Sequence, residues 1–239
     1  MALPSTASKP PSADGRTTIG GPKAFEFDAA RCGQTGYTDD DGNVWTALRS
    51  TSGGKTVIQS VPARCTRSVI QLRIDDWIDV PGAALPPMKA TDNFSVSLVY
   101  RQWATPVAFG RLFSTQANST SATTGVYFLT NVDVLQARVA DGVTLAGAGS
   151  PGDWRPAVRE VASLVATDAG QTLNLYRTGL LRSVSAAPVG DRTSPAARIG
   201  CNLNGAACSD LDFEALVIHR FSIGPNVHAA LTAGFNGGQ

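Results

Sequence analysis

Residues 68–101 read SVIQLRIDDWIDVPGAALPPMKATDNFSVSLVYR, and the end of this stretch decides the fold. Apolar and polar side chains alternate there, and the apolar ones are Phe94, Val96, Leu98 and Tyr100. A period of two is typical of a strand with one buried face and one solvated face. The stretch therefore predicts a strand of an antiparallel sheet whose apolar side chains point toward a core.

A second stretch, residues 159–185, reads REVASLVATDAGQTLNLYRTGLLRSVS and repeats this pattern. Leu173 and Leu175 alternate with polar neighbours, and Gly179 supplies a turn before the chain returns, which predicts a β-hairpin. Further short β-rich runs cover residues 126–129, 134–139 and 216–221. Turn residues separate the runs at intervals of about 8–12 residues, which is the spacing of a β-sandwich.

One short helix is predicted near the C-terminus, over residues 225–233 (PNVHAALTA). Pro225 suits the first helical position, and Gly234 is predicted to end the helix. In the sandwich, six apolar side chains are predicted to be buried between the sheets: Phe94, Val96, Leu98, Leu173, Leu175 and Val217.

The two stretches, together with ARIGCN at 197–202 and DLDFEALVIHRFSI at 210–223, resemble a known pattern. They are similar to the laminin-G-like branch of the concanavalin A-like lectin/glucanase superfamily, a domain also found in minor tail and capsid decoration proteins of (actino)bacteriophages. The resemblance implies an all-β protein, an antiparallel β-sandwich of the jelly-roll type. It leaves the function open, because this fold hosts lectins, hydrolases and assembly modules.

Composition excludes some classes of function. The chain has 239 residues and a formal net charge of +1, so no electrostatic argument favours nucleic acid as a partner. No apolar run is long enough to span a membrane. Residues 1–22 (MALPSTASKPPSADGRTTIGGP) lack the apolar segment of a signal peptide and are rich in Pro, Ser and Gly. We expect them to form an extended N-terminal arm that docks on a neighbouring subunit, ahead of one sandwich at 23–239.

Four cysteines allow three disulfide connectivities. Cys201 and Cys208 flank a loop short enough for a local bridge, and Cys32 would then pair with Cys65. Four buried free thiols are the alternative. Zinc is not expected, because the sequence has no C-x-x-C pair.

Acidic residues in the sequence DLDFE raise the question of catalysis. Asp210, Asp212 and Glu214 are spaced by two, so a regular strand would place them on one face. They are similar in position to the acidic strand of laminarinase-type glucanases, but in those enzymes the first position of the motif is Glu. We expect a solvated strand face or a weak ligand-binding site here rather than a pair of catalytic carboxyls.

Two other groups of residues are candidate ligand sites. Asp39, Asp41 and Asn43 supply oxygen ligands that calcium accepts, but the Asp-Gly pair between them is also a strong hairpin signal. No other cofactor is expected. Trp103 and Trp154 offer flat rings on which a sugar can stack, although the resemblance implies that Trp154 packs in the core.

These observations together favour a non-enzymatic accessory protein of a phage virion, either a minor tail protein or a capsid decoration protein. It would be synthesised in the host cytoplasm and bind other virion proteins through residues 1–22, in several copies. Its loops would face host-surface glycans. The alternatives are a free carbohydrate-binding lectin module and a glycoside hydrolase.

Overall fold

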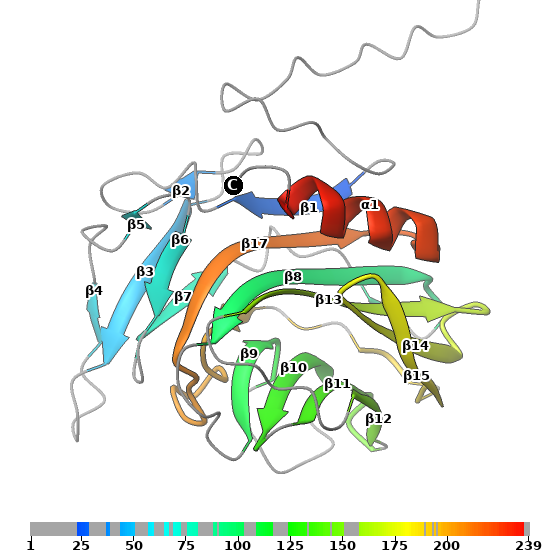
Figure 1. Ribbon diagram of the computed structural model, residues 1–239. Coiled ribbons are helices and arrows are strands. Elements are labelled where there is room, and N and C mark those ends of the chain that lie inside the picture. The colour runs from blue at the N-terminus through cyan, green and yellow to red at the C-terminus, as the bar shows by residue number, and fades with distance from the viewer. Residues whose placement is uncertain are drawn as a thin grey trace, which may run out of the picture.

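The computed structural model describes the chain mainly over its C-terminal two thirds, and its strands are labelled in Figure 1. The described residues are 88–89, 91–102, 109–116, 124–132, 134–143, 145–150, 158–188, 190–192, 194 and 196–236, together with the strands between residues 23 and 80. The predicted arm at 1–22 lies outside them, as do Cys32, Asp39, Asp41, Asn43, Trp103 and Trp154.

The first of two sheets, called sheet I here, contains eight strands. Seven follow one another in the order β15 (Leu180–Ala186), β14 (Thr172–Arg177), β13 (Arg159–Thr167), β8 (Phe94–Gln102), β17 (Leu211–His219), β6 (Val69–Leu72) and β5 (Cys65–Thr66). The eighth, β1 (Lys23–Asp28), pairs with the second half of β17. Strands β14 and β15 form the predicted hairpin, in which Thr178 and Gly179 adopt the positive φ angles of a tight turn.

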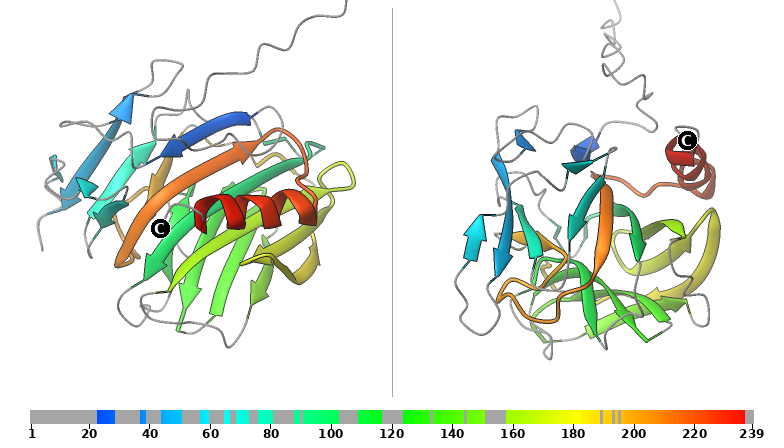
Figure 2. Two further views of the ribbon diagram at one scale, coloured as in Figure 1. Left: turned by 45° about the horizontal axis from the view of Figure 1, so that its top comes forward. Right: turned by 60° about the vertical axis from the view of Figure 1, so that its left-hand side comes forward.

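Sheet II contains nine strands and packs against sheet I (Figure 2). Its order is β12 (Leu145–Ser150), β11 (Val134–Ala140), β10 (Gly125–Asn131), β9 (Gly110–Ser114), β16 (Ala197–Ile199), β7 (Asp76–Val80), β3 (Val44–Ser50) and β2 (Tyr37–Thr38), with β4 (Val57–Gln59) on β3. All strand pairs among the described residues are antiparallel. The predicted all-β antiparallel sandwich is therefore confirmed.

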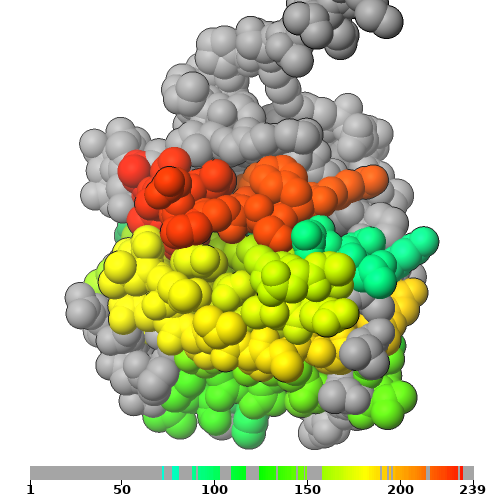
Figure 3. Space-filling view, turned by 90° about the vertical axis from the view of Figure 1, so that its right-hand side faces the viewer, coloured from blue at the N-terminus to red at the C-terminus, as the bar shows by residue number. Residues whose placement is uncertain are grey.

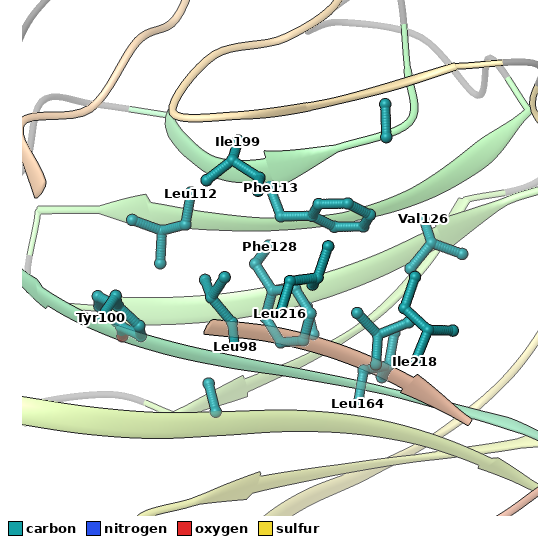
Figure 4. Close-up of a cluster of buried hydrophobic side chains, with 14 of the residues drawn as sticks. Leu98, Tyr100, Leu112, Phe113, Val126, Phe128, Leu164, Ile199, Leu216 and Ile218 are labelled. Carbon is teal, nitrogen blue, oxygen red and sulfur yellow. The ribbon is translucent and has the colours of Figure 1, made fainter. Parts of the chain in front are cut away.

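The core lies between the two sheets and explains the alternation in the sequence (Figure 4). Five of the six side chains predicted to be buried there belong to this cluster: Phe94, Val96, Leu98, Leu173 and Leu175. Phe113 and Phe128 approach them from sheet II. Full burial of one such side chain stabilises the fold by about 1.5–3 kcal/mol, so this cluster is the main source of stability.

Val217 is buried, but the prediction that it lies between the sheets is wrong. The register of β17 against β8 shifts between Phe213 and Ala215, which inserts one extra residue into β17. A bulge of this kind reverses the alternation beyond it. Leu216 and Ile218 consequently join the core, and Val217 lies on the other face of the strand.

Helix α1 (Pro225–Asn236) lies along the outer face of sheet I, above β13 and β8 (Figures 1 and 2). It begins at Pro225 as predicted, but it continues through Gly234 instead of ending before it. A glycine inside a helix costs only about 1 kcal/mol. Burial of the helix against the sheet, where His228 and Thr232 are enclosed, offsets that cost.

Candidate functional site

The outer face of sheet II gathers arginine, aromatic and amide side chains from five strands. Because Ile78, Ala197 and Phe128 point into the core, their neighbours along the chain point outward. The strand pairing sets these outward residues in one row across the sheet, from Asp79 through Arg198, Ser114, Tyr127 and Arg138 to Gly147. We call this row and its outward neighbours Trp77, Arg111, Leu129, Gln136 and Gly149 the arginine face.

One end of the arginine face is a compact group around Trp77. The guanidinium carbon of Arg198 lies 4.6 Å from the centre of the Trp77 ring, and its Nε donates to Asp79 Oδ1 at 2.6 Å. The side chains of Arg198 and Asp79 are 17% and 40% exposed. Cation–π contact and ion pairing thus hold this arginine flat over the indole while leaving its edge accessible to solvent.

A disulfide bond between Cys201 and Cys208 supports this end of the face, and their Cα atoms are 4.1 Å apart. Both cysteines pack against the buried Trp77. The loop that they close also reaches β9, because the backbone N–H of Arg111 donates to the carbonyl of Ala207 at 2.7 Å. Cys65 lies in β5, and its proposed bridge to Cys32 falls outside the described residues.

The middle of the arginine face is buried. The guanidinium carbon of Arg111 lies 4.0 Å from the centre of the Tyr127 ring, and both side chains are almost completely enclosed. Burial lowers the pKa of Arg111 below its usual value, and the positive charge of Arg138 lowers it further. This part positions the neighbouring strands and is closed to solvent.

The other end, on β11 and β12, is open. Gln136 and Arg138 are half-buried on β11, and they stand in register with Gly149 and Gly147 on β12. The Nη2 atom of Arg138 donates to Gln136 Oε1 at 2.5 Å. Since the two glycines carry no side chains, the peptide backbone of β12 forms an open floor beside the arginine and the amide. The result is a polar strip on β11 that is bordered by side-chain-free positions on β12.

The acidic candidates predicted from the sequence belong to β17 of sheet I or directly precede it. Asp212 is buried on the outer face of sheet I, between Gln71 of β6 and Arg101 of β8 in the strand register. Asp210 precedes the first residue of β17, and the bulge falls at Glu214. The regular spacing that would place all three acids on one face therefore does not continue through this strand.

A buried serine–histidine pair joins β13 of sheet I to helix α1 and resembles a catalytic pair, but its hydrogen bonds run in the opposite direction. Ser163 Oγ lies 2.7 Å from His228 Nδ1, and the backbone N–H of Gly179 donates to His228 Nε2 at 3.0 Å. Since Nε2 accepts a hydrogen bond, Nδ1 carries the ring hydrogen and donates to Ser163. Burial lowers the pKa of His228 to about 4. The ring is thus a neutral donor to the serine, the reverse of the role of a general base.

A buried carboxylate, Glu160, lies at the end of the core. Tyr100 Oη donates to Glu160 Oε2 at 2.7 Å, and Arg177 Nη2 donates to Oε1 at 2.5 Å. Burial raises the pKa of Tyr100, and the charge of Glu160 raises it further. A carboxylate engaged in this way fixes β8, β13 and β14 to one another, as a structural ion pair does.

The described residues contain neither a cluster of metal ligands nor a membrane-spanning helix. No three of their His, Cys, Asp or Glu side chains come close enough to hold a metal ion. The calcium candidates Asp39, Asp41 and Asn43 are outside this part of the chain. Within the same residues, no helix has the length and apolar character needed to cross a membrane.

The signal for the arginine face is present in the sequence but weak. Gln136 and Arg138 alternate with apolar residues in VLQARVA, and Gly147 and Gly149 alternate with alanines in LAGAGS. Each pattern alone indicates only a strand with one solvated face. Their significance depends on the pairing of β11 with β12 and on the crossover that places Arg198 in the same sheet.

Comparison with known proteins supports the fold. No protein-family profile matches the chain, and no curated protein matches its sequence. Domain 4 of AbnA, an extracellular GH43 arabinanase from Geobacillus stearothermophilus solved with arabinotriose, has a TM-score of 0.61 at 12% identity, covering 88% of this chain and 98% of that domain. The binding domain of botulinum neurotoxin serotype D gives 0.63 at 11% identity.

The share of each chain that is matched differs from one of these structures to another. The match to the serotype D toxin covers 89% of this chain but 51% of the toxin domain, so this chain spans about half its length. The CBM40 of the Ruminococcus gnavus IT-sialidase has a TM-score of 0.51 at 12% identity and covers 59% of this chain and 83% of that one. At these identities the likeness establishes a shared β-sandwich fold.

Proposed function

We propose that this protein is a glycan-binding module and that the arginine face of sheet II carries its binding site. The observation that carries the proposal is the open end of that face. There Arg138 and Gln136 of β11 stand in register with Gly147 and Gly149 of β12, which carry no side chains. Sugars are bound by planar arrays of amide and guanidinium groups that exchange hydrogen bonds with ring hydroxyls, and this surface offers such an array.

The structural neighbours give independent support. The arabinanase domain was solved in complex with arabinotriose, and the IT-sialidase CBM40 also exists bound to α2,3-sialyllactose. A toxin binding domain of the same fold was solved with SialylT. Carbohydrate binding thus recurs among sandwiches that share this architecture, although the fold by itself does not determine function.

In this proposal the module binds its glycan without cleaving it. Retaining hydrolysis requires two carboxyls about 5–5.5 Å apart that flank the scissile bond. Asp212 is buried opposite Arg101, and Glu160 is engaged by Tyr100 and Arg177. The buried His228 donates to Ser163 rather than activating it.

The setting that we propose is the surface of a phage particle, as a minor tail protein or a capsid decoration protein. The support is the resemblance to such domains and the Pro-, Ser- and Gly-rich composition of residues 1–22, which suits an extended docking arm. The sandwich would be displayed toward host-surface glycans while the arm holds it on the particle.

A glycan array tests the binding function. Purified full-length protein is applied to neutral and acidic oligosaccharides, and binding to at least one class is expected. Chromatography of the same oligosaccharides after incubation checks for cleavage, and none is expected. Failure to bind any glycan on the array overturns the proposal. Cleavage of an oligosaccharide that is lost in Asp212→Asn or Glu214→Gln would show instead that the protein is a glycoside hydrolase.

Deletion of residues 1–22 tests the setting separately. The truncated protein should keep its glycan binding and fail to join particles, because only the arm contacts other virion proteins in this proposal. Incorporation at the level of the full chain would exclude the arm as the anchor.

A further inference from the structure

The open end of the arginine face carries the positive charge of Arg138. Arg138 is half-buried in the middle of β11, where its neighbours in register are Tyr127 on β10 and Gly147 on β12. Its guanidinium bonds to the neutral amide of Gln136. Among the described residues no carboxylate pairs with it, whereas Arg198 at the other end of the face is paired with Asp79.

A second positive charge stands next to it. Like charges repel, and the charge of Arg138 contributes to lowering the pKa of Arg111, whose guanidinium lies over the Tyr127 ring. A half-buried cation that neighbours another cation and bonds to an amide is a poor arrangement for stability alone. An anion placed over β11 and β12 would relieve the repulsion, so the local field favours a negatively charged group.

The absence of a side chain at Gly147 allows Arg138 to occupy its observed position. A Cβ atom at this position would lie 2.8 Å from Arg138 Cγ and 3.3 Å from the carbonyl oxygen of Ala137. The glycine therefore lets the arginine stem lie directly over β12. At Gly149 a Cβ would stand 3.8 Å from Gln136 Cγ, which is an ordinary contact, so only Gly147 is required for the position of the arginine.

From this geometry we infer that the site takes an acidic saccharide and that Arg138 binds its carboxylate, with Gln136 holding the guanidinium in position. The inference rests on the proposed glycan-binding function and names its substrate class. The planar guanidinium matches the two oxygens of a carboxylate, and the exposed backbone of β12 leaves room for the sugar ring beside it. The carboxylate is the contact that distinguishes an acidic sugar from a neutral one at this site.

The test compares matched ligands on matched variants. Calorimetric titration of the full-length protein with α2,3-sialyllactose, an oligogalacturonate, a sulfated oligosaccharide and lactose gives the affinity for carboxylated, sulfated and neutral sugars. The wild-type protein is expected to prefer the carboxylated ligands, and the preference should shrink as salt is raised. Arg138→Gln should weaken the binding of carboxylated ligands by about 10- to 100-fold, the value of one charge-assisted bond, and weaken the binding of lactose far less, because only neutral hydrogen bonds are lost there.

Three further variants separate charge from position. Arg220→Ala removes an exposed arginine that directly follows β17 and should bind as the wild type does, which controls for net charge. Gly147→Ala keeps Arg138 but displaces its stem, and it should lose the preference for carboxylate, whereas Gly149→Ala should keep it. Thermal unfolding confirms that each variant is folded.

The possible results distinguish failure of the glycan-binding function from failure of the inference about acidic sugars. If the protein binds no sugar of any class, the glycan-binding function itself fails. If it binds lactose as tightly as the acidic ligands, or if Arg138→Gln leaves the acidic affinity intact, the function stands and the inference is overturned. A preference for sulfated over carboxylated ligands that still depends on Arg138 overturns the assignment of carboxylate.

Discussion

Acidification should weaken the fold through His228, the residue that joins helix α1 to sheet I. The ring lies between Ser163 of β13 and the backbone N–H of Gly179 in the β14–β15 turn, and Tyr176 packs beside it with ring centres 5.3 Å apart. Figure 3 shows this hairpin (yellow) between α1 (red) and the strands of sheet II (green). Protonation of Nε2 would abolish the bond from Gly179, since a cationic ring has no acceptor.

The direction of the effect follows from the two protonation equilibria. The folded pKa is about 4 and the ordinary value is 6.5, so between these values the unfolded chain binds more protons than the folded protein. The stability that depends on the neutral ring is fully present above pH 6.5 and is lost as the pH falls toward 4. Across that window the loss from this residue alone is about 3 kcal/mol.

The measurement is urea unfolding of the wild type and of His228→Asn between pH 7.5 and pH 4. The variant has no titrating group at this position, so the difference between the two free energies of unfolding isolates His228 from every other ionisable residue. At pH 7 the variant should be less stable, because the N–H of Gly179 loses its acceptor. The gap should close as the pH falls. A gap that stays constant from pH 7.5 to pH 4 would refute the assignment of a neutral, buried ring.

Three other substitutions test the packing. Leu164→Ala removes a fully buried side chain of the main core and should lower the free energy of unfolding by about 2–5 kcal/mol in urea; a loss below 1 kcal/mol would contradict its place there. Arg177→Ala leaves the carboxylate of Glu160 buried without its guanidinium and should cost about 3–5 kcal/mol, part of which a second change of Glu160→Gln should restore. Gly190→Ala should cost about 1–3 kcal/mol, because its Cβ would fall 2.6 Å from the Cβ of Asp141; an unchanged melting temperature would show that the loop moves aside freely.

The strands were the predictable part of this fold, because each is specified by side chains a few positions apart. The alternation around Leu98 and the turn at Gly179 are local, and both are found where the sequence places them. The bulge in β17 was not predictable, since it is defined by how Phe213 and Ala215 align with a strand more than a hundred residues earlier. Val217 was misplaced for that reason.

The arginine face illustrates the same limit for a site. Asp210, Asp212 and Glu214 drew attention because they are neighbours in sequence, whereas Arg138 and Arg198 are sixty residues apart and share one face only through the order of the strands in sheet II. A ligand surface on a sheet runs across the strands, perpendicular to the chain. Sequence patterns run along the chain, so they reveal one member of each row at a time.

The group of Trp77 with the Cys201–Cys208 disulfide gives the molecule an internal optical reporter. A disulfide in contact with an indole quenches its emission, and the buried ring should emit at short wavelength. Reduction of the bond would therefore brighten the blue side of the tryptophan spectrum before the fold is lost. Intrinsic fluorescence can then follow the oxidation of this corner in real time, during production of the protein or in contact with its natural environment, without a label.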